Sequence, residues 1–154
     1  MKTLDLFRPI GVIFLLFCTL SCGLKPVERE TYIEGKVLLS SGQPAVNYPL
    51  QINYYKASEG FYGRGELVVL QKLTTNQDGA FSYQGLFKSG GLGAGHYELS
   101  YGYSVYLNNQ YYTVDSVSAE IPGQYAQGQI NHQYDGSLFP SKRHIIKIVL
   151  KKGN

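Results

Sequence analysis

From Cys22 onward, the chain carries no sustained 3.6-residue apolar repeat, and apolar residues instead alternate with polar ones over short segments. Alternation of this kind turns one side of a strand toward a core and the other toward water. The composition agrees, because 14 Tyr and 7 Phe suit a pleated, half-buried surface and 18 Gly supply turns. The sequence therefore predicts an all-β domain without helices.

Alternation and turn residues locate about seven strands. They are expected at 33–39, 50–54, 66–75, 80–83, 97–107, 110–121 and 143–151. In the last of these, Ile146, Ile148 and Leu150 are expected to face inward. About seven short strands joined by turns predict a single antiparallel β-sandwich of two sheets. The local pattern does not determine the strand order.

The longest predicted hairpin turns at Asn108-Asn109, because asparagine tolerates the positive φ that a two-residue turn requires. This turn pairs Leu107 with Gln110. If the pairing continued without interruption, the later apolar residues of the second strand would face away from the core. One extra residue in that strand would return them to the core face. We therefore predict a β-bulge within 115–117. The alternative is a strand that passes from one sheet to the other.

The beginning of the chain has the features of a secretory signal. A basic start precedes an apolar run of 11 residues, 10–20, which ends at Thr19-Leu20-Ser21-Cys22. The run is shorter than the ~20 residues that a membrane-spanning helix needs. The segment resembles the lipobox of bacterial lipoproteins, which implies cleavage before Cys22 and acylation of that residue. Ordinary secretion is the competing interpretation.

The expected organisation is a signal peptide over 1–21, a lipidated cysteine with a tether over 22–30, and the sandwich over 31–152. The resemblance implies a lipid-anchored protein of the cell envelope. Gly23 follows Cys22 where enteric lipoproteins retained in the inner membrane carry Asp, so the resemblance favours the outer membrane, on its periplasmic or surface face. Without Cys18, and with Cys22 acylated, no thiol is left for a disulfide.

Several motifs of the domain resemble one family of sandwich modules. They read IEGKV at 33–37, GQPAVNYPL at 42–50, TNQDGAF at 75–81 and GHYEL at 95–99. These stretches look like the carboxypeptidase regulatory-like and transthyretin-like (prealbumin-like) family. The resemblance implies a β-sandwich in which Phe81 and Tyr97 fill the core. It says little about function, since such modules serve as accessory domains in many surface proteins.

Catalytic interpretations find little support in the sequence. None of His96, His132 and His144 is followed by Glu three residues on, as metallocarboxypeptidases require, and the end Lys-Lys-Gly-Asn differs from the Tyr-Arg-Gly-Ser of hydroxyisourate hydrolases. His132 and Asp135 offer two metal ligands where zinc sites use three or four. We therefore expect no enzyme, metal or cofactor. Scattered basic residues also argue against a nucleic-acid partner.

Function is expected in two long or glycine-rich loops, 84–95 and 122–142. The candidate binding residues of the second loop are Tyr125, His132, Tyr134 and Phe139. Aromatic faces stack on sugars or bury in a partner, although these side chains could equally pack onto the sandwich. The leading hypothesis is a noncatalytic, lipid-anchored interaction or accessory module of the cell envelope, with an envelope protein or a glycan as its partner. The alternatives are a carbohydrate-binding lipoprotein and, third, an enzyme of unrecognised type.

Overall fold

The computed structural model describes residues 26–56, 65–90, 95–121 and 134–153. These residues form two β-sheets and contain no helix, so the predicted all-β sandwich is confirmed. No helix in this part of the chain could therefore cross a bilayer. The strands are β1 (Val27–Leu39), β2 (Pro49–Lys56), β3 (Glu66–Thr74), β4 (Ala80–Ser89), β5 (His96–Ser100), β6 (Ser104–Leu107), β7 (Gln110–Glu120), β8 (Ser137–Leu138) and β9 (Arg143–Lys152).

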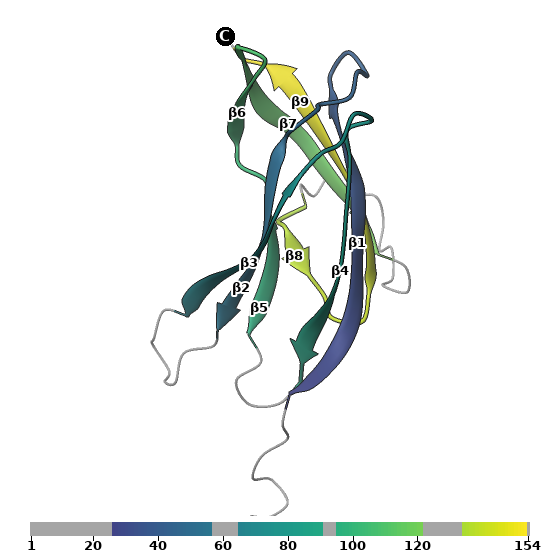
Figure 1. Cartoon of the computed structure of the whole chain (residues 1–154), viewed down its shortest axis with the longest axis vertical. Helices are drawn as coiled ribbons and strands as arrows, with labels where there is room; N and C mark the ends of the chain where they lie inside the picture. Colours follow the sequence, from purple (N-terminus) through teal and green to yellow (C-terminus); the bar gives the residue numbers. More distant parts are fainter. Residues whose placement is uncertain (1–25, 57–64, 91–94, 122–133, 154) are drawn as a thin grey trace, which may run out of the picture.

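One sheet has five strands in the order β4-β1-β9-β7-β6, and the other has four in the order β3-β2-β5-β8 (Figure 1). All strand pairs are antiparallel except β1 and β9, which run parallel with Tyr32 beside Arg143 and Leu39 beside Leu150. This pair joins the first and last strands of the chain. No local turn encodes it, which is why alternation alone did not reveal the parallel pair.

The hairpin prediction is confirmed in detail. Asn108 and Asn109 have φ values of 49° and 63°, and Leu107 pairs with Gln110. The bulge is also present, because the β7–β9 register shifts between Val114 and Ser116. Asp115 is therefore the extra residue. Beyond the bulge, the side chain of Val117 is buried, so the extra residue returns the apolar side chains of β7 to the core as predicted.

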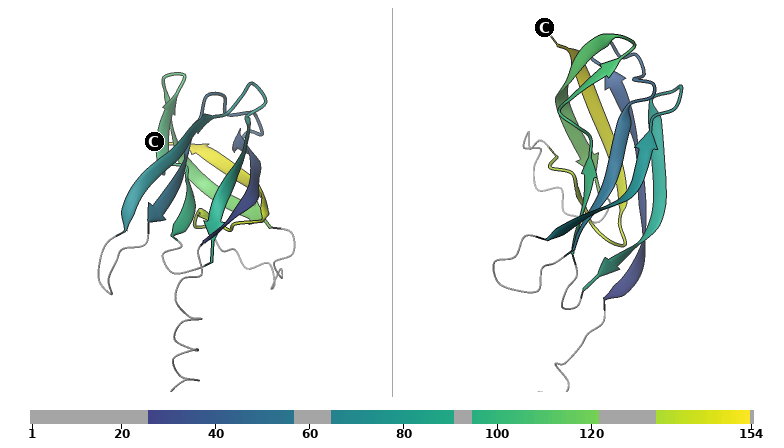
Figure 2. Two further views of the ribbon diagram at one scale, coloured as in Figure 1. Left: turned by 60° about the horizontal axis from the view of Figure 1, so that its bottom comes forward. Right: turned by 60° about the vertical axis from the view of Figure 1, so that its left-hand side comes forward.

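The expected single strand over 97–107 is wrong. The structure divides it into β5 and β6, which belong to different sheets (Figure 2). Gly102, with a φ of 56°, lies in the connection between them. Positive φ is accessible to glycine at little cost, and it lets the chain leave one sheet and join the other. The apolar alternation continues across this break, so the sequence pattern did not reveal it.

Long-range pairing lengthens two strands beyond their predicted ends. Val27 pairs with Ser89 at the far end of the β1–β4 ladder, so β1 begins before the expected residue 33. The sandwich thus includes 27–30, which we had assigned to the tether. For the same reason, 84–89 belongs to β4 and not to a glycine-rich loop.

The core lies between the two sheets and is aliphatic and aromatic. In β9, the inward positions of Ile146, Ile148 and Leu150 are confirmed. Phe87 stacks on Tyr97 with ring centroids 4.0 Å apart and planes inclined by 3°. Each fully buried side chain of this size contributes about 1.5–3 kcal/mol relative to exposure. The buried apolar residues are Ile33, Val37, Ala45, Tyr48, Leu50, Ile52, Phe81, Phe87, Tyr97, Leu99, Val117, Leu138, Ile146, Ile148 and Leu150.

Candidate binding surfaces

The residues proposed for acylation and binding divide between the described and undescribed parts of the chain. Cys22, Tyr125 and His132 lie outside the described residues. Tyr134 and Phe139 are described, and both lie beside β8 in the segment that leads to β9. The structure therefore places only these two of the four loop candidates, and it places them in different environments.

Tyr134 is tied to the protein by both its side chain and its backbone. Its hydroxyl donates a hydrogen bond to the Ser137 carbonyl at 2.6 Å, and its own carbonyl accepts one from the Tyr101 hydroxyl at 2.8 Å. Burial is the main cause that raises the pKa of Tyr134. Its ring packs against the core. These contacts give Tyr134 a structural role in holding the segment before β8.

Phe139 is partly exposed, and its ring stacks on His144 with centroids 6.1 Å apart. Nε2 of His144 lies 3.1 Å from the Phe139 amide and 3.2 Å from the Phe139 carbonyl oxygen, and the imidazole tautomer decides whether Nε2 accepts from the amide or donates to the carbonyl. His144 is fully buried, and this burial lowers its pKa. Sequence reasoning considered this histidine only as a zinc ligand. The alternation that turns Ile146 inward extends to His144, two residues earlier, and could have located it in the core.

The carboxylate of Asp135 also forms a local hydrogen bond. Its Oδ1 accepts a hydrogen bond from the Ser137 amide at 2.9 Å, and this bond is the main cause that lowers the Asp135 pKa. Within the described ranges, no group of three or more His, Cys, Asp or Glu residues is arranged to hold a metal ion.

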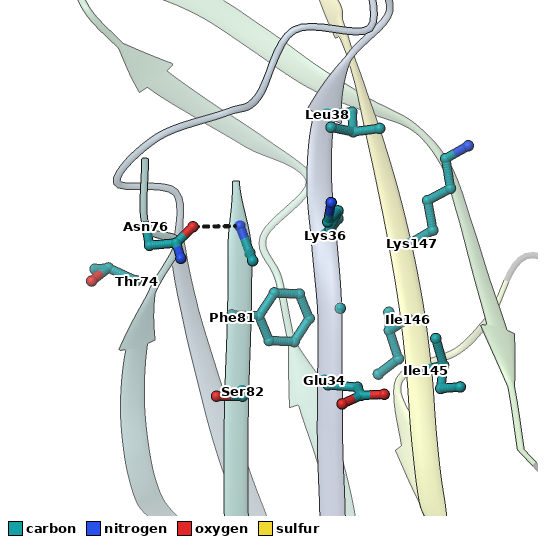
Figure 3. A pocket seen from close by; sticks show the side chains of 12 residues that line it. Glu34, Lys36, Leu38, Thr74, Asn76, Phe81, Ser82, Ile145, Ile146 and Lys147 are labelled. Carbon is teal, nitrogen blue, oxygen red and sulfur yellow. Dashed lines mark hydrogen bonds between the residues drawn. The ribbon is translucent and has the colours of Figure 1, made fainter. Parts of the chain in front are cut away.

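The outer face of the five-stranded sheet carries an open depression of about 870 Å³ (Figure 3). It extends over β4, β1 and β9 and reaches Thr74 and Asn76 at the beginning of the turn before β4. Its lining is mixed. The apolar lining residues are Leu38, Ala80, Phe81, Ile145 and Ile146, and the polar ones are Glu34, Lys36, Thr74, Asn76, Ser82 and Lys147. The lining residues are Glu34, Gly35, Lys36, Leu38, Thr74, Asn76, Ala80, Phe81, Ser82, Ile145, Ile146 and Lys147.

The charges of this depression are partly neutralised. Glu34 accepts hydrogen bonds from Arg143 through Nη2 at 2.7 Å and Nε at 3.1 Å. Lys36 and Lys147 are neighbours in the β1–β9 register. Neither lysine has an ion-pair partner among the described residues. The two ammonium groups and the hydroxyls of Thr74 and Ser82 can bind an anionic or hydrogen-bonding group, and the apolar side chains add contact area.

Asn76 shapes the upper rim of the depression. Its Oδ1 accepts hydrogen bonds from the amides of Asp78 and Ala80, both at 2.9 Å, and thereby holds the turn that leads into β4 (Figure 3). The lining contains no His or Cys. Glu34 and Ser82, which both line the depression, are partners in the β1–β4 ladder.

A second surface consists of tyrosines on and beside the β6–β7 hairpin. Tyr103 and Tyr106 are 81% and 75% exposed, and the ring of Tyr106 lies 5.1 Å from that of Tyr111. Tyr103 lies within the segment 97–107 that was expected to be one strand, in the connection that follows Gly102. The hairpin and the start of β1 lie at opposite ends of the molecule (Figure 1).

No protein-family model matches the sequence, and a search of curated proteins finds no match.

Proposed function

We propose that this protein is a noncatalytic, lipid-anchored module of the bacterial cell envelope that works by binding an envelope protein. The observation that carries this proposal is the sequence Thr19-Leu20-Ser21-Cys22 at the end of a short apolar run behind a basic start. Its resemblance to a lipobox assigns acylation to Cys22. Dual acylation provides the two membrane signals that stable anchoring requires.

The arrangement of the sandwich is compatible with this role. Five residue steps separate Cys22 from Val27, where β1 begins, and a chain of that length spans at most about 18 Å. The start of β1 would therefore lie close to the membrane. The β6–β7 hairpin, on and beside which the exposed tyrosines lie, would be at the end far from the membrane, where a partner can reach it (Figure 1).

Acylation is tested by mass spectrometry of the native protein from its own membrane. We expect a chain that begins at Cys22 and carries the added mass of fatty acyl groups. The variant C22A is expected to lose this mass and to leave the membrane fraction, while C18A, which changes a residue of the removed segment, keeps both. A water-soluble native protein with another N-terminus and no lipid would overturn the proposal.

A second candidate function is carbohydrate binding, and the exposure of Tyr103 and Tyr106 favours it. Flat aromatic rings stack on sugars, and nearby amides and hydroxyls provide hydrogen bonds. Binding on a glycan array that is lost in Y103A/Y106A would support this function. Tyr32, an exposed tyrosine of β1, provides the matched control Y32A. Loss in Y125A instead would favour the loop 122–142 that the sequence indicated, whereas Y134A would also remove core contacts of Tyr134.

A further inference from the structure

Strand β3 exposes four consecutive apolar residues. Leu67, Val68, Val69 and Leu70 are 51%, 37%, 44% and 40% exposed. Because side chains alternate between the two faces of a strand, such a run exposes both faces of β3. The strand lies at the border of the four-stranded sheet and pairs only with β2 among the described strands (Figure 2). Its other side therefore presents backbone N–H and C=O groups to a further strand.

The other border strands are protected in ways that β3 is not. β8 and β6 have two and four residues, and short borders offer little for another chain to pair with. β4 is long, but it contains Gly85 and carries Gln84 and Lys88 on its solvent face, on either side of the exposed Leu86. β3 has nine residues without Gly or Pro. Its charges are confined to Glu66 and Lys72, on either side of the apolar run.

We propose that β3 is a docking site for an extended segment of a partner protein, which adds to the four-stranded sheet as an antiparallel fifth strand. The inference rests on the proposed binding role and names the kind of partner. Main-chain hydrogen bonds supply affinity in strand addition, and side chains supply specificity. The partner segment is apolar at its centre, with an acidic residue opposite Lys72 near its start and a basic residue opposite Glu66 near its end.

A second copy of this chain fits the site less well. Two β3 strands related by a twofold axis would run antiparallel and reverse one molecule relative to the other. Since β1 and β3 both begin at the lower end of the molecule in Figure 1, the reversed copy would carry its tether on the far side. A tether of at most about 18 Å could not return it to the same membrane. A partner segment has no such constraint.

The β2–β3 pairing has one irregularity that bears on the site. The register shifts between Ile52 and Asn53, which makes Leu70 an extra residue in β3. Bulges in border strands can also prevent pairing. The backbone contribution must therefore be measured directly, apart from the contribution of the side chains.

The probe is a labelled synthetic peptide, Glu-Thr-Val-Thr-Val-Thr-Lys with blocked ends, added to the full chain in detergent. We expect saturable binding by fluorescence anisotropy, together with slower amide hydrogen exchange in β3. The matched control has the same side chains with alternate backbone amides N-methylated, and it should bind at least about tenfold more weakly because it cannot complete the ladder. Equal binding of both peptides, or unchanged exchange in β3, would overturn the proposal.

Charge reversal tests the orientation. The exposed variant E66K/K72E should bind the original peptide about threefold more weakly, as expected for surface ion pairs. It should regain affinity for the peptide with its Glu and Lys interchanged. Unchanged affinities would overturn the antiparallel register, and chain dimers detected by light scattering without peptide would favour the second copy. Failure of the peptide leaves the acyl mass at Cys22 unaffected, so loss of this proposal is distinguishable from loss of the proposed anchoring.

Discussion

The ring of Phe81 occupies the space that a side chain at Gly35 would need. The two residues are partners in the β1–β4 ladder, and a Cβ added at Gly35 would lie 2.7 Å from Cζ of Phe81 and in contact with the carbonyl oxygen of Ile146. Glycine at this position lets an aromatic ring from a border strand close the core (Figure 3).

The substitution G35A should therefore destabilise the domain by about 1–3 kcal/mol, the range found for overpacked cores. Urea denaturation measures this change in the free energy of unfolding. The exposed neighbour Lys36 provides the control K36A, expected to change it by less than about 0.5 kcal/mol. In the background F81L, which removes part of the ring, the cost of G35A should shrink. An equal cost in both backgrounds would show that the ring is not the obstacle.

The Asn108-Asn109 turn makes a separate prediction. Both residues have positive φ, a conformation that β-branched side chains rarely adopt. We expect N109V to cost about 1–3 kcal/mol and N109G to be neutral or stabilising. Gln110, the next residue, begins β7, so Q110V should be tolerated. Thermal unfolding distinguishes these variants. If N109V were as stable as Q110V, valine at position 109 would not strain the turn.

This hairpin shows which parts of the fold the sequence could predict. Its turn residues, register and bulge all follow from neighbouring residues and from the alternation of faces, and all three were predicted correctly. The break at Gly102 and the parallel β1–β9 pair depend on contacts between distant segments. Local alternation is the same whether a strand continues or changes sheets, so neither feature could be read from it.

Tyrosines show the corresponding limit for the binding surfaces. Tyr134 was a candidate for recognition, but its hydroxyl bonds to a backbone carbonyl within the domain. Tyr106 is exposed, and its neighbours on either side in β6 are partly buried. The sequence alone does not distinguish these two roles of a tyrosine, because its ring can pack in a core and its hydroxyl can hydrogen-bond to a partner. Only its position in the folded chain separates them.

Tyr48 provides a third prediction about stability. Its ring is buried, and its hydroxyl donates to the carbonyl of Tyr101 and lies 3.2 Å from that of Gly102. It thus ties the segment before β2 to the point where the chain changes sheets. Burial raises the pKa of Tyr48 to about 12, so the hydroxyl stays protonated and able to donate at neutral pH.

The variant Y48F should lower the free energy of unfolding by about 1–3 kcal/mol, because it leaves a carbonyl without its donor. Y106F removes a hydroxyl from an exposed tyrosine and should have almost no effect. Urea denaturation compares the two. Equal stabilities of Y48F and the unchanged protein would show that water or another donor replaces the Tyr48 hydroxyl.

The buried His144 predicts how stability depends on pH. Burial disfavours its charged form, so its pKa in the folded protein lies below the ordinary value of about 6.5 that applies when the chain is unfolded. Between these two values the unfolded chain binds more protons than the folded one. This contribution to stability is therefore complete above about pH 6.5 and declines as the pH falls toward the lower, folded value.

Replacement by glutamine separates this titration from the hydrogen bond. In H144Q a side-chain oxygen can still accept from the Phe139 amide, but no proton is taken up in this range. The stability of H144Q should therefore vary less between pH 6.5 and pH 5 than that of the unchanged protein, whatever its absolute stability. His96, an exposed residue of β5, provides H96Q as a control for the effect of the substitution itself. If H144Q and the unchanged protein lose stability in parallel as the solution is acidified, another group governs the transition.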